Sequence, residues 1–114
     1  MKNSYKLADV FDLLSGQVEN QVLPIAENLG GLNLLAAINS GKIEEEWEAA
    51  VAKAKAAIAA VHPEFVKSAE PFIVQAKQVL AGTPEKQGSE VAYFYVLREA
   101  KKDLIGGFGE TLEV

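Results

Sequence analysis

The chain lacks cysteine and has a single histidine and a single arginine among its 114 residues. Without cysteine it can have no thiol nucleophile, no disulfide, no redox pair and no cysteine-ligated zinc site. The histidine, His62, stands directly before Pro63, and the sequence allows no nucleophile or orienting carboxylate to be placed beside it. We therefore interpret His62 as a capping or surface residue rather than as a general base.

Basic residues are few: Lys and Arg number 11 against 16 Asp and Glu, which gives a net charge of −5. Proteins that bind nucleic acid neutralise its phosphates with clustered lysine and arginine, so we expect no direct contact with nucleic acid. Long apolar runs are also missing, because Lys53 and Lys55 interrupt the most apolar segment, 49–61. A membrane span needs about 18 uninterrupted apolar residues. Since residues 1–6 show no signal-peptide pattern, we expect a cytoplasmic protein, or one within a particle assembled in the cytoplasm.

Motifs typical of enzymes are missing too. The glycine pairs lack the lysine of a phosphate-binding loop and the spacing of a dinucleotide site, and no serine stands in a Gly-x-Ser-x-Gly motif. The glutamates at 44–46 and 48 occupy the first turns of a predicted helix, where negative charge favours the helix dipole. They come without the Glu-x-x-His motifs of di-metal sites in helix bundles. We therefore expect no catalytic residue, no cofactor and no metal, in a protein that is not an enzyme.

Apolar residues recur at helical spacing along most of the chain. Gly16 and Pro24 interrupt the first stripe, which predicts either one kinked helix or two helices that meet near Gly16. The alanine-rich segment 49–60 lies in the clearest helix and would let a neighbouring helix come close. Pro71 either begins a fresh helix or bends the one around it. The segments expected to be helical are 7–30 with its break, 32–39, 43–61 and 63–82.

Residues 91–97 have the β-branched and aromatic composition of a strand, but their continuation to Ile105 is helical. Tyr93, Leu97 and Leu104 keep one face across the junction, and Ser89 is placed as an N-cap after a loop over 85–89. We favour a helix here over a strand. Its apolar residues run almost all round, which indicates a helix that is central in the fold or packs against another subunit.

The sequence changes character after Ile105, where three glycines occur within four residues. We expect them to end the helix, with Gly106 and Gly107 as a hinge. Phe108, Leu112 and Val114 then stand at even spacing, the period of a strand. These features predict a tail that adds to an edge or groove of a neighbouring copy, with docking on its own chain left open. Removal of residues 106–114 should accordingly leave the helices intact and lower the assembly state.

These patterns predict an all-α fold with one helical domain over residues 1–105 and a glycine-hinged, extended C-terminal tail over 106–114. The connections of a few residues favour antiparallel neighbours. We expect a compact bundle of four to five helices. The predicted core consists of Leu14, Val22, Ile25, Trp47, Val51, Ile58, Phe65, Phe72, Tyr93 and Leu97.

We expect a non-catalytic structural or interaction subunit of a homo-oligomer or larger assembly, for example a viral or phage particle component or an assembly adaptor. The partner would be another copy or another protein, and the basic cluster of Arg98, Lys101 and Lys102 could contact the 44–48 glutamates of the next copy. A second hypothesis is a small acidic inhibitor or regulator that binds a target through an aromatic patch. A third is a ligand carrier or enzyme with a cavity between helices. The residues expected to contact a partner are Tyr93, Phe94, Tyr95, Arg98, Phe108, Leu112 and Val114.

Overall fold

The computed structural model describes residues 3–17, 22–82 and 86–114. The fold is mainly α-helical, and helices account for 82% of the described residues. In chain order the elements are β1 (Ser4–Lys6), α1 (Leu7–Ser15), α2 (Leu23–Gly30), α3 (Leu34–Ser40), α4 (Ile43–Val61), α5 (Pro63–Gly82), α6 (Lys86–Phe108) and β2 (Thr111–Glu113).

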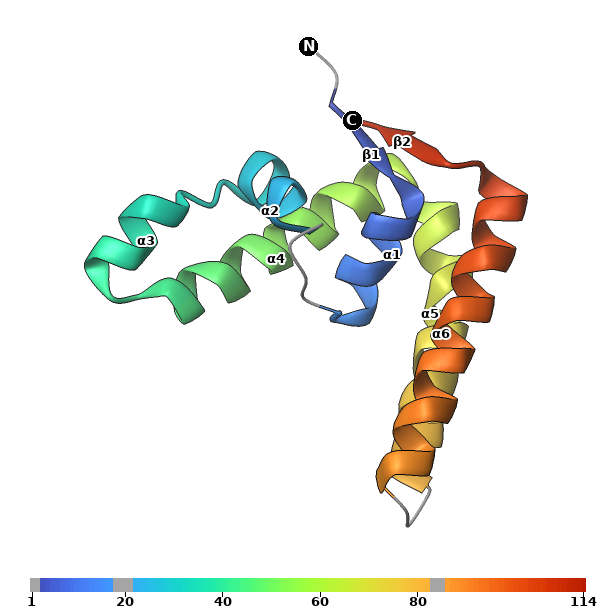
Figure 1. Cartoon of the computed structure of the whole chain (residues 1–114). Helices are drawn as coiled ribbons and strands as arrows, with labels where there is room; N and C mark the ends of the chain where they lie inside the picture. The colour runs from blue at the N-terminus through green and yellow to red at the C-terminus, as the bar shows by residue number, and fades with distance from the viewer. Residues whose placement is uncertain (1–2, 18–21, 83–85) are drawn as a thin grey trace.

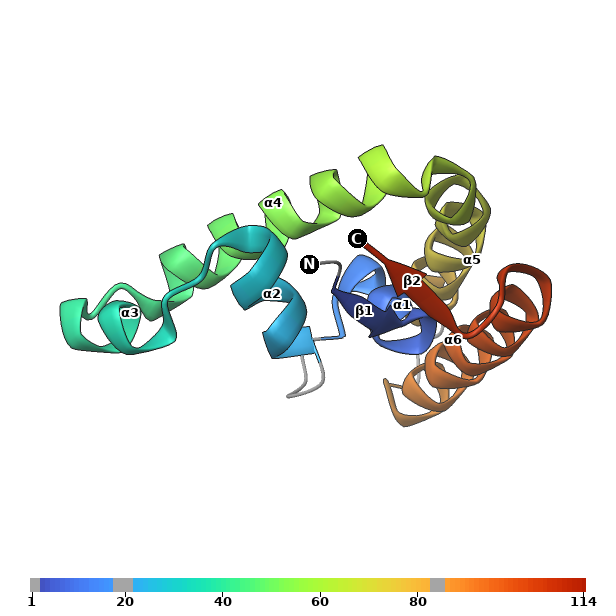
Figure 2. The ribbon, with the colours of Figure 1, turned by 90° about the horizontal axis from the view of Figure 1, so that it is seen from above.

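The helices form two arms that meet at α1 (Figure 1). One arm consists of α2, α3 and most of α4, and the other is the long hairpin of α5 and α6. Seen from above, α1 and the two strands lie in the angle between the arms (Figure 2). The extents are 41 × 34 × 18 Å and the radius of gyration is 15.0 Å, compared with about 13 Å for a compact domain of this length. The structure therefore corrects the expectation of a compact bundle of four to five helices: the described residues form six helices in two arms.

The breaks between helices mostly follow the sequence. Gly16, Gly31 and Gly41 follow the ends of α1, α2 and α3 with φ angles of 82°, 69° and 73°, a left-handed conformation that glycine adopts without strain. Helix α4 ends before Pro63, which begins α5, and α5 continues through Pro71. The predicted break near Gly16 is confirmed, while the segment 18–21 that follows it lies outside the described residues.

Helix α6 differs from the prediction at both ends. The segment 91–97 is helical, as favoured. The helix already includes 86–89, which were expected to be a loop with Ser89 as the N-cap of the following helix. At the other end the helix continues through Gly106 and Gly107 to Phe108, and only Gly109, with φ 99°, leaves it. Each glycine costs a helix about 1 kcal/mol relative to alanine. Packing of Leu104 and Phe108 against the core offsets that cost, so the predicted hinge is helical.

The main core surrounds α1. Its largest fully buried side chains include Leu7, Val10 and Phe11 from α1, Ile58 from α4 and Phe65 from α5. Helix α1 contacts α4, α5 and α6, so residues on several of its sides are buried. Of the predicted core, Val22, Ile25, Ile58, Phe65 and Leu97 are buried, whereas Leu14, Trp47, Val51, Phe72 and Tyr93 are half-buried.

A smaller cluster joins α2 to α4 through small side chains. Gly30, the last residue of α2, lies against the backbone of Ala50, and an added Cβ would come within 2.1 Å of the Ala50 carbonyl oxygen. Two helices approach this closely only where side chains are absent or small. The close approach expected from the alanine-rich segment is therefore present. The buried members of this cluster are Ala26, Leu32, Ala37 and Ala50.

The two ends of the chain pair with each other. Strand β2 lies antiparallel to β1, with Tyr5 opposite Leu112 and both side chains buried. Reciprocal bonds between Asn3 and Val114, at 2.7 and 2.8 Å, extend the ladder. Figure 1 shows β1 and β2 side by side. The structure thus has the tail docked on its own chain, the alternative that the sequence left open, and not on a neighbour as we expected, because residues 111–113 form a strand with the chain's own N-terminal segment.

The Tyr5 hydroxyl allows a test of this ribbon. It is buried and has no hydrogen-bond partner within the described part of the chain. A buried, unpaired hydroxyl is destabilising, so Tyr5→Phe should leave the free energy of unfolding unchanged or raise it by up to about 1 kcal/mol. Tyr93→Phe is the matched control, because the Tyr93 hydroxyl accepts a hydrogen bond from Gln17 at 2.7 Å, and its loss should cost about 1 kcal/mol. Urea denaturation measures both, and a clear loss of stability in Tyr5→Phe would contradict the prediction.

Candidate protein-interaction surface

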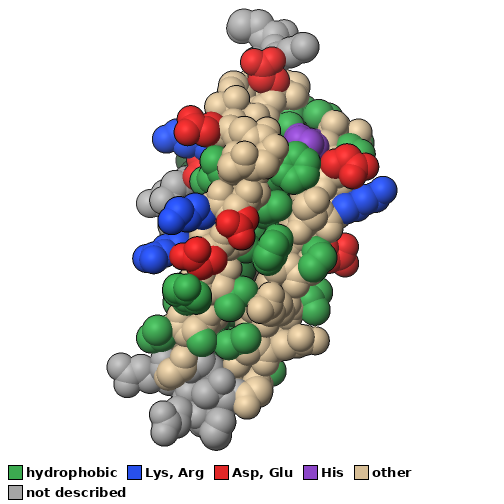
Figure 3. Space-filling model, turned by 90° about the vertical axis from the view of Figure 1, so that its right-hand side faces the viewer, with side chains coloured by type: hydrophobic (Ala, Val, Ile, Leu, Met, Phe, Trp, Pro, Cys, Tyr) green, Lys and Arg blue, Asp and Glu red, His purple; other side chains and the backbone are tan. Residues whose placement is uncertain are grey.

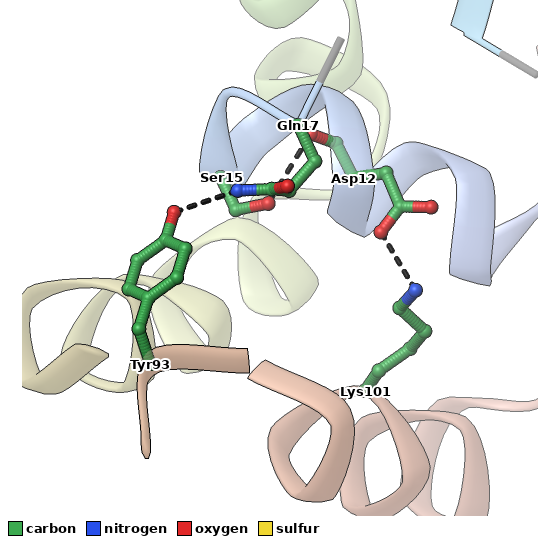
Figure 4. Close-up of polar contacts among 5 residues, drawn as sticks. All are labelled: Asp12, Ser15, Gln17, Tyr93 and Lys101. Carbon is green, nitrogen blue, oxygen red and sulfur yellow. Dashed lines mark hydrogen bonds and ion pairs between the residues drawn. The ribbon is translucent and has the colours of Figure 1, made fainter. Parts of the chain in front are cut away.

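Two polar contacts with the end of α1 fix the orientation of α6 (Figure 4). The Lys101 ammonium lies 2.7 Å from a carboxylate oxygen of Asp12, and both side chains are largely buried. Nearer the N-terminus of α6, the Tyr93 hydroxyl accepts a hydrogen bond from the side-chain amide of Gln17 at 2.7 Å. An ion pair that is largely shielded from water stabilises the fold by more than the fraction of a kcal/mol typical of exposed pairs. These contacts turn Tyr93, Leu97 and Lys101 toward the core, and the opposite side of α6 faces solvent.

The outward side of α6 carries three large apolar residues. Val91 is 67% exposed, Phe94 55% and Tyr95 60%. Spacings of three and four residues place them on one face of the helix. In the space-filling view, hydrophobic side chains run along the face, and charged side chains lie among them in its upper and middle parts but not in the lower part that the structure describes (Figure 3). We call Val91, Phe94 and Tyr95 the apolar patch of α6.

Basic residues continue the same face toward the C-terminus. Arg98 and Lys102 are exposed, and the Arg98 side chain is 79% exposed. Its guanidinium lies 4.0 Å from Glu99, at the outer limit of an ion pair. The structure therefore divides the predicted basic cluster, because Lys101 points inward to Asp12 while Arg98 and Lys102 point outward.

The chain matches no protein-family model, no curated protein and no solved structure. Function is therefore inferred from the chemistry and exposure of this chain's own surface.

The predicted contact residues separate into two groups. Phe94, Tyr95 and Arg98 are exposed together on α6, with the half-buried Tyr93 at the edge of the patch, where its ring meets that of Phe94 at 5.3 Å. The tail residues lie elsewhere and are used within the chain. Phe108 packs edge-on against Phe65 and His62, Leu112 is buried, and Val114 pairs with Asn3.

His62 lies at the corner between α4 and α5. Its Nδ1 atom accepts a hydrogen bond from the backbone N–H of Phe65 at 3.4 Å, and its ring packs against Phe65 and Phe108. This is the capping position expected from the sequence. Among the described residues no three His, Asp or Glu side chains gather as metal ligands would. No helix in the described ranges has the length and apolar character needed to cross a membrane.

One surface feature was not anticipated from the sequence, a shallow hollow of about 360 Å³ along α4. It is lined by Trp47, Glu48, Val51, Ala52 and Lys55. Trp47 and Val51 were expected in the core and are instead half-buried, so part of each side chain forms the floor of this hollow. The signal that could have revealed it is the spacing of Glu44, Glu48 and Lys55, which places charges along the edge of the same apolar face.

Proposed function

We propose that the chain is a non-catalytic structural or interaction subunit that acts in a homo-oligomer or larger assembly, with the outer face of α6 as its contact surface. The observation that carries this proposal is the exposure of Val91, Phe94 and Tyr95 on one side of α6. Aromatic residues contribute strongly at protein interfaces because they bury large areas with little loss of side-chain freedom. Burial of apolar surface contributes about 25 cal/mol per Å², so covering this patch would stabilise a complex.

A second function is favoured by the same patch together with the net charge of −5. The chain could be a small acidic inhibitor or regulator that binds one target protein through the aromatic residues of α6. The two functions differ in the identity of the partner. An assembly subunit contacts copies of itself, whereas a regulator stays monomeric until its target is present.

Light scattering after size exclusion, over a range of protein concentrations, tests the proposal. We expect the intact chain to form dimers or larger species, and Phe94→Ser with Tyr95→Ser to shift the mass toward the monomer. Leu35→Ser with Ile38→Ser is the matched control, because these α3 residues are 70% and 56% exposed on the other arm. That control should assemble like the wild type. A monomer at every concentration would contradict assembly and favour the regulator.

A further inference from the structure

Two helices carry surface stripes with the same spacing and opposite charge. On α4, Glu44, Glu48, Val51 and Lys55 follow one another at intervals of four, three and four residues, and the two glutamates are exposed. We call these four residues the α4 stripe. The α6 stripe has the same intervals and consists of Val91, Tyr95, Arg98 and Lys102. On a helix such intervals keep all four side chains on one narrow face.

We propose that the α6 stripe of one copy docks antiparallel on the α4 stripe of a second copy. This inference rests on the proposed function and names its partner surface. In the antiparallel register Lys102 lies opposite Glu44, and Arg98 lies opposite Glu48. Tyr95 then enters the hollow floored by Trp47 and Val51.

The fourth facing pair of the antiparallel register, Lys55 opposite Val91, can also form a favourable contact. Lys55 lines the far end of the hollow and lies opposite Val91, which is 67% exposed. The aliphatic part of a lysine can cover an apolar side chain while its ammonium stays in water. The same ammonium lies within one helical turn of the Tyr95 ring, whose face attracts cations.

Charge selects the antiparallel orientation over the parallel one. In a parallel register Lys102 would face Lys55, which places like charges together, and Glu44 would face the apolar Val91. The antiparallel register has two opposite-charge pairs and no like-charge pair among the facing positions. It also places the N-terminus of each helix beside the C-terminus of the other, so that opposite ends of the two helix dipoles are neighbours, which is favourable. Complementary charges contribute to specificity as well as to attraction.

The two stripes lie on different arms of the molecule (Figure 1). Most of α4, including its stripe, belongs to the arm with α2 and α3, and α6 belongs to the hairpin with α5. The two stripes of one copy are therefore separate surfaces, and each has exposed charged residues, Glu44 and Glu48 on α4 and Arg98 and Lys102 on α6. Used reciprocally, the contact closes a dimer, and used once per copy it continues into a ring or chain.

Charge exchange across the contact provides the test. The first variant, Arg98→Glu with Lys102→Glu, makes both stripes acidic. The second, Glu44→Lys with Glu48→Lys, removes the acidic partner and makes both stripes basic. Alone, each should weaken self-association by about tenfold or more, because two attractive pairs become repulsive. Mixed in equal amounts, the two variants should form a complex with affinity close to that of the wild type, because each acidic stripe then meets a basic one.

Analytical ultracentrifugation measures the dissociation constants, and circular dichroism confirms that the variants fold. Lys67→Glu with Lys77→Glu is the control for net charge, since both lysines are exposed on α5 and the number of reversals is the same. It should associate more strongly than the first variant. If the wild type assembles while the first variant behaves like this control, or if mixing the two stripe variants restores nothing, the α4–α6 contact is overturned and the proposed function stands. A wild type that stays monomeric overturns both.

Discussion

Replacing Gly30 by alanine should destabilise the fold by about 2 to 3 kcal/mol, the upper range for overpacking a closely packed site. An added Cβ would lie 2.1 Å from the carbonyl oxygen of Ala50 and 2.8 Å from its Cα atom. These are backbone atoms of α4 and cannot rotate away as a flexible side chain could. Relief therefore requires α2 to move off α4, which separates Ala26 and Ala50 in the smaller cluster.

The measurement is thermal unfolding followed by circular dichroism. For a domain of this size a loss of 2 to 3 kcal/mol corresponds to a fall in Tm of about 10 °C. Gly107→Ala is the matched control, because Gly107 also lies in a helix but has no atom within 4 Å of an added Cβ. There the substitution should stabilise the fold by about 0.5 to 1 kcal/mol through helix propensity. Equal effects at the two glycines would contradict the close approach of α2 and α4.

The sequence predicts helix positions correctly where apolar periodicity and helix-ending glycine or proline residues agree. The alanine-rich helix α4, the turn at Pro63 and the end of α3 at Gly41 all follow such local signals. Local signals do not say how helices are arranged, because arrangement depends on contacts between distant segments. The two arms and the central place of α1 arise from such contacts, so a compact bundle was expected where the structure has two arms.

The terminal ribbon shows the same limit at both ends of the chain. Strand β1 has three residues, too few for alternation to be distinguished from the start of a helix, and its partner is at the other end of the sequence. The low helix propensity of glycine predicts that Gly106 and Gly107 end the helix. Burial of Leu104 and the packing of Phe108 against Phe65 override that propensity.

For the candidate surface, the sequence identified the residues of a possible contact but not which side chains point to solvent and which point to the core. Phe94, Tyr95 and Arg98 were expected to contact a partner, and the structure places all three on the solvent side of α6. Periodicity could not assign Lys101 to the inner side, because its pairing with Asp12 depends on where α1 lies. Periodicity could not predict the contacts of Phe108, Leu112 and Val114 within the chain either, because these contacts depend on how distant segments of the chain pack together.

The second large effect is expected at Leu112. Its side chain is buried opposite Tyr5, while the neighbouring Thr111 and Glu113 are exposed. Leu112→Ala should therefore cost about 2 to 3 kcal/mol, the lower range for a buried leucine. Thr111→Ala should cost less than about 0.5 kcal/mol, as at other exposed positions. Urea denaturation measures both, and equal stability of the two variants would show that β2 contributes nothing to the core.

Removal of residues 110–114 should have a larger effect than Leu112→Ala, since the ladder with β1 is lost together with the buried leucine. The backbone groups of Asn3 and Leu7 that bond to Val114 and Glu110 would lose their partners, and Tyr5 would become exposed. This expectation replaces the one from sequence alone, in which loss of the tail leaves the helices intact and lowers the assembly state. The deletion leaves Val91, Phe94 and Tyr95 in place on α6. At temperatures where the shortened chain is still folded, its self-association should therefore match that of the full chain, because the proposed contact surface does not include the ribbon.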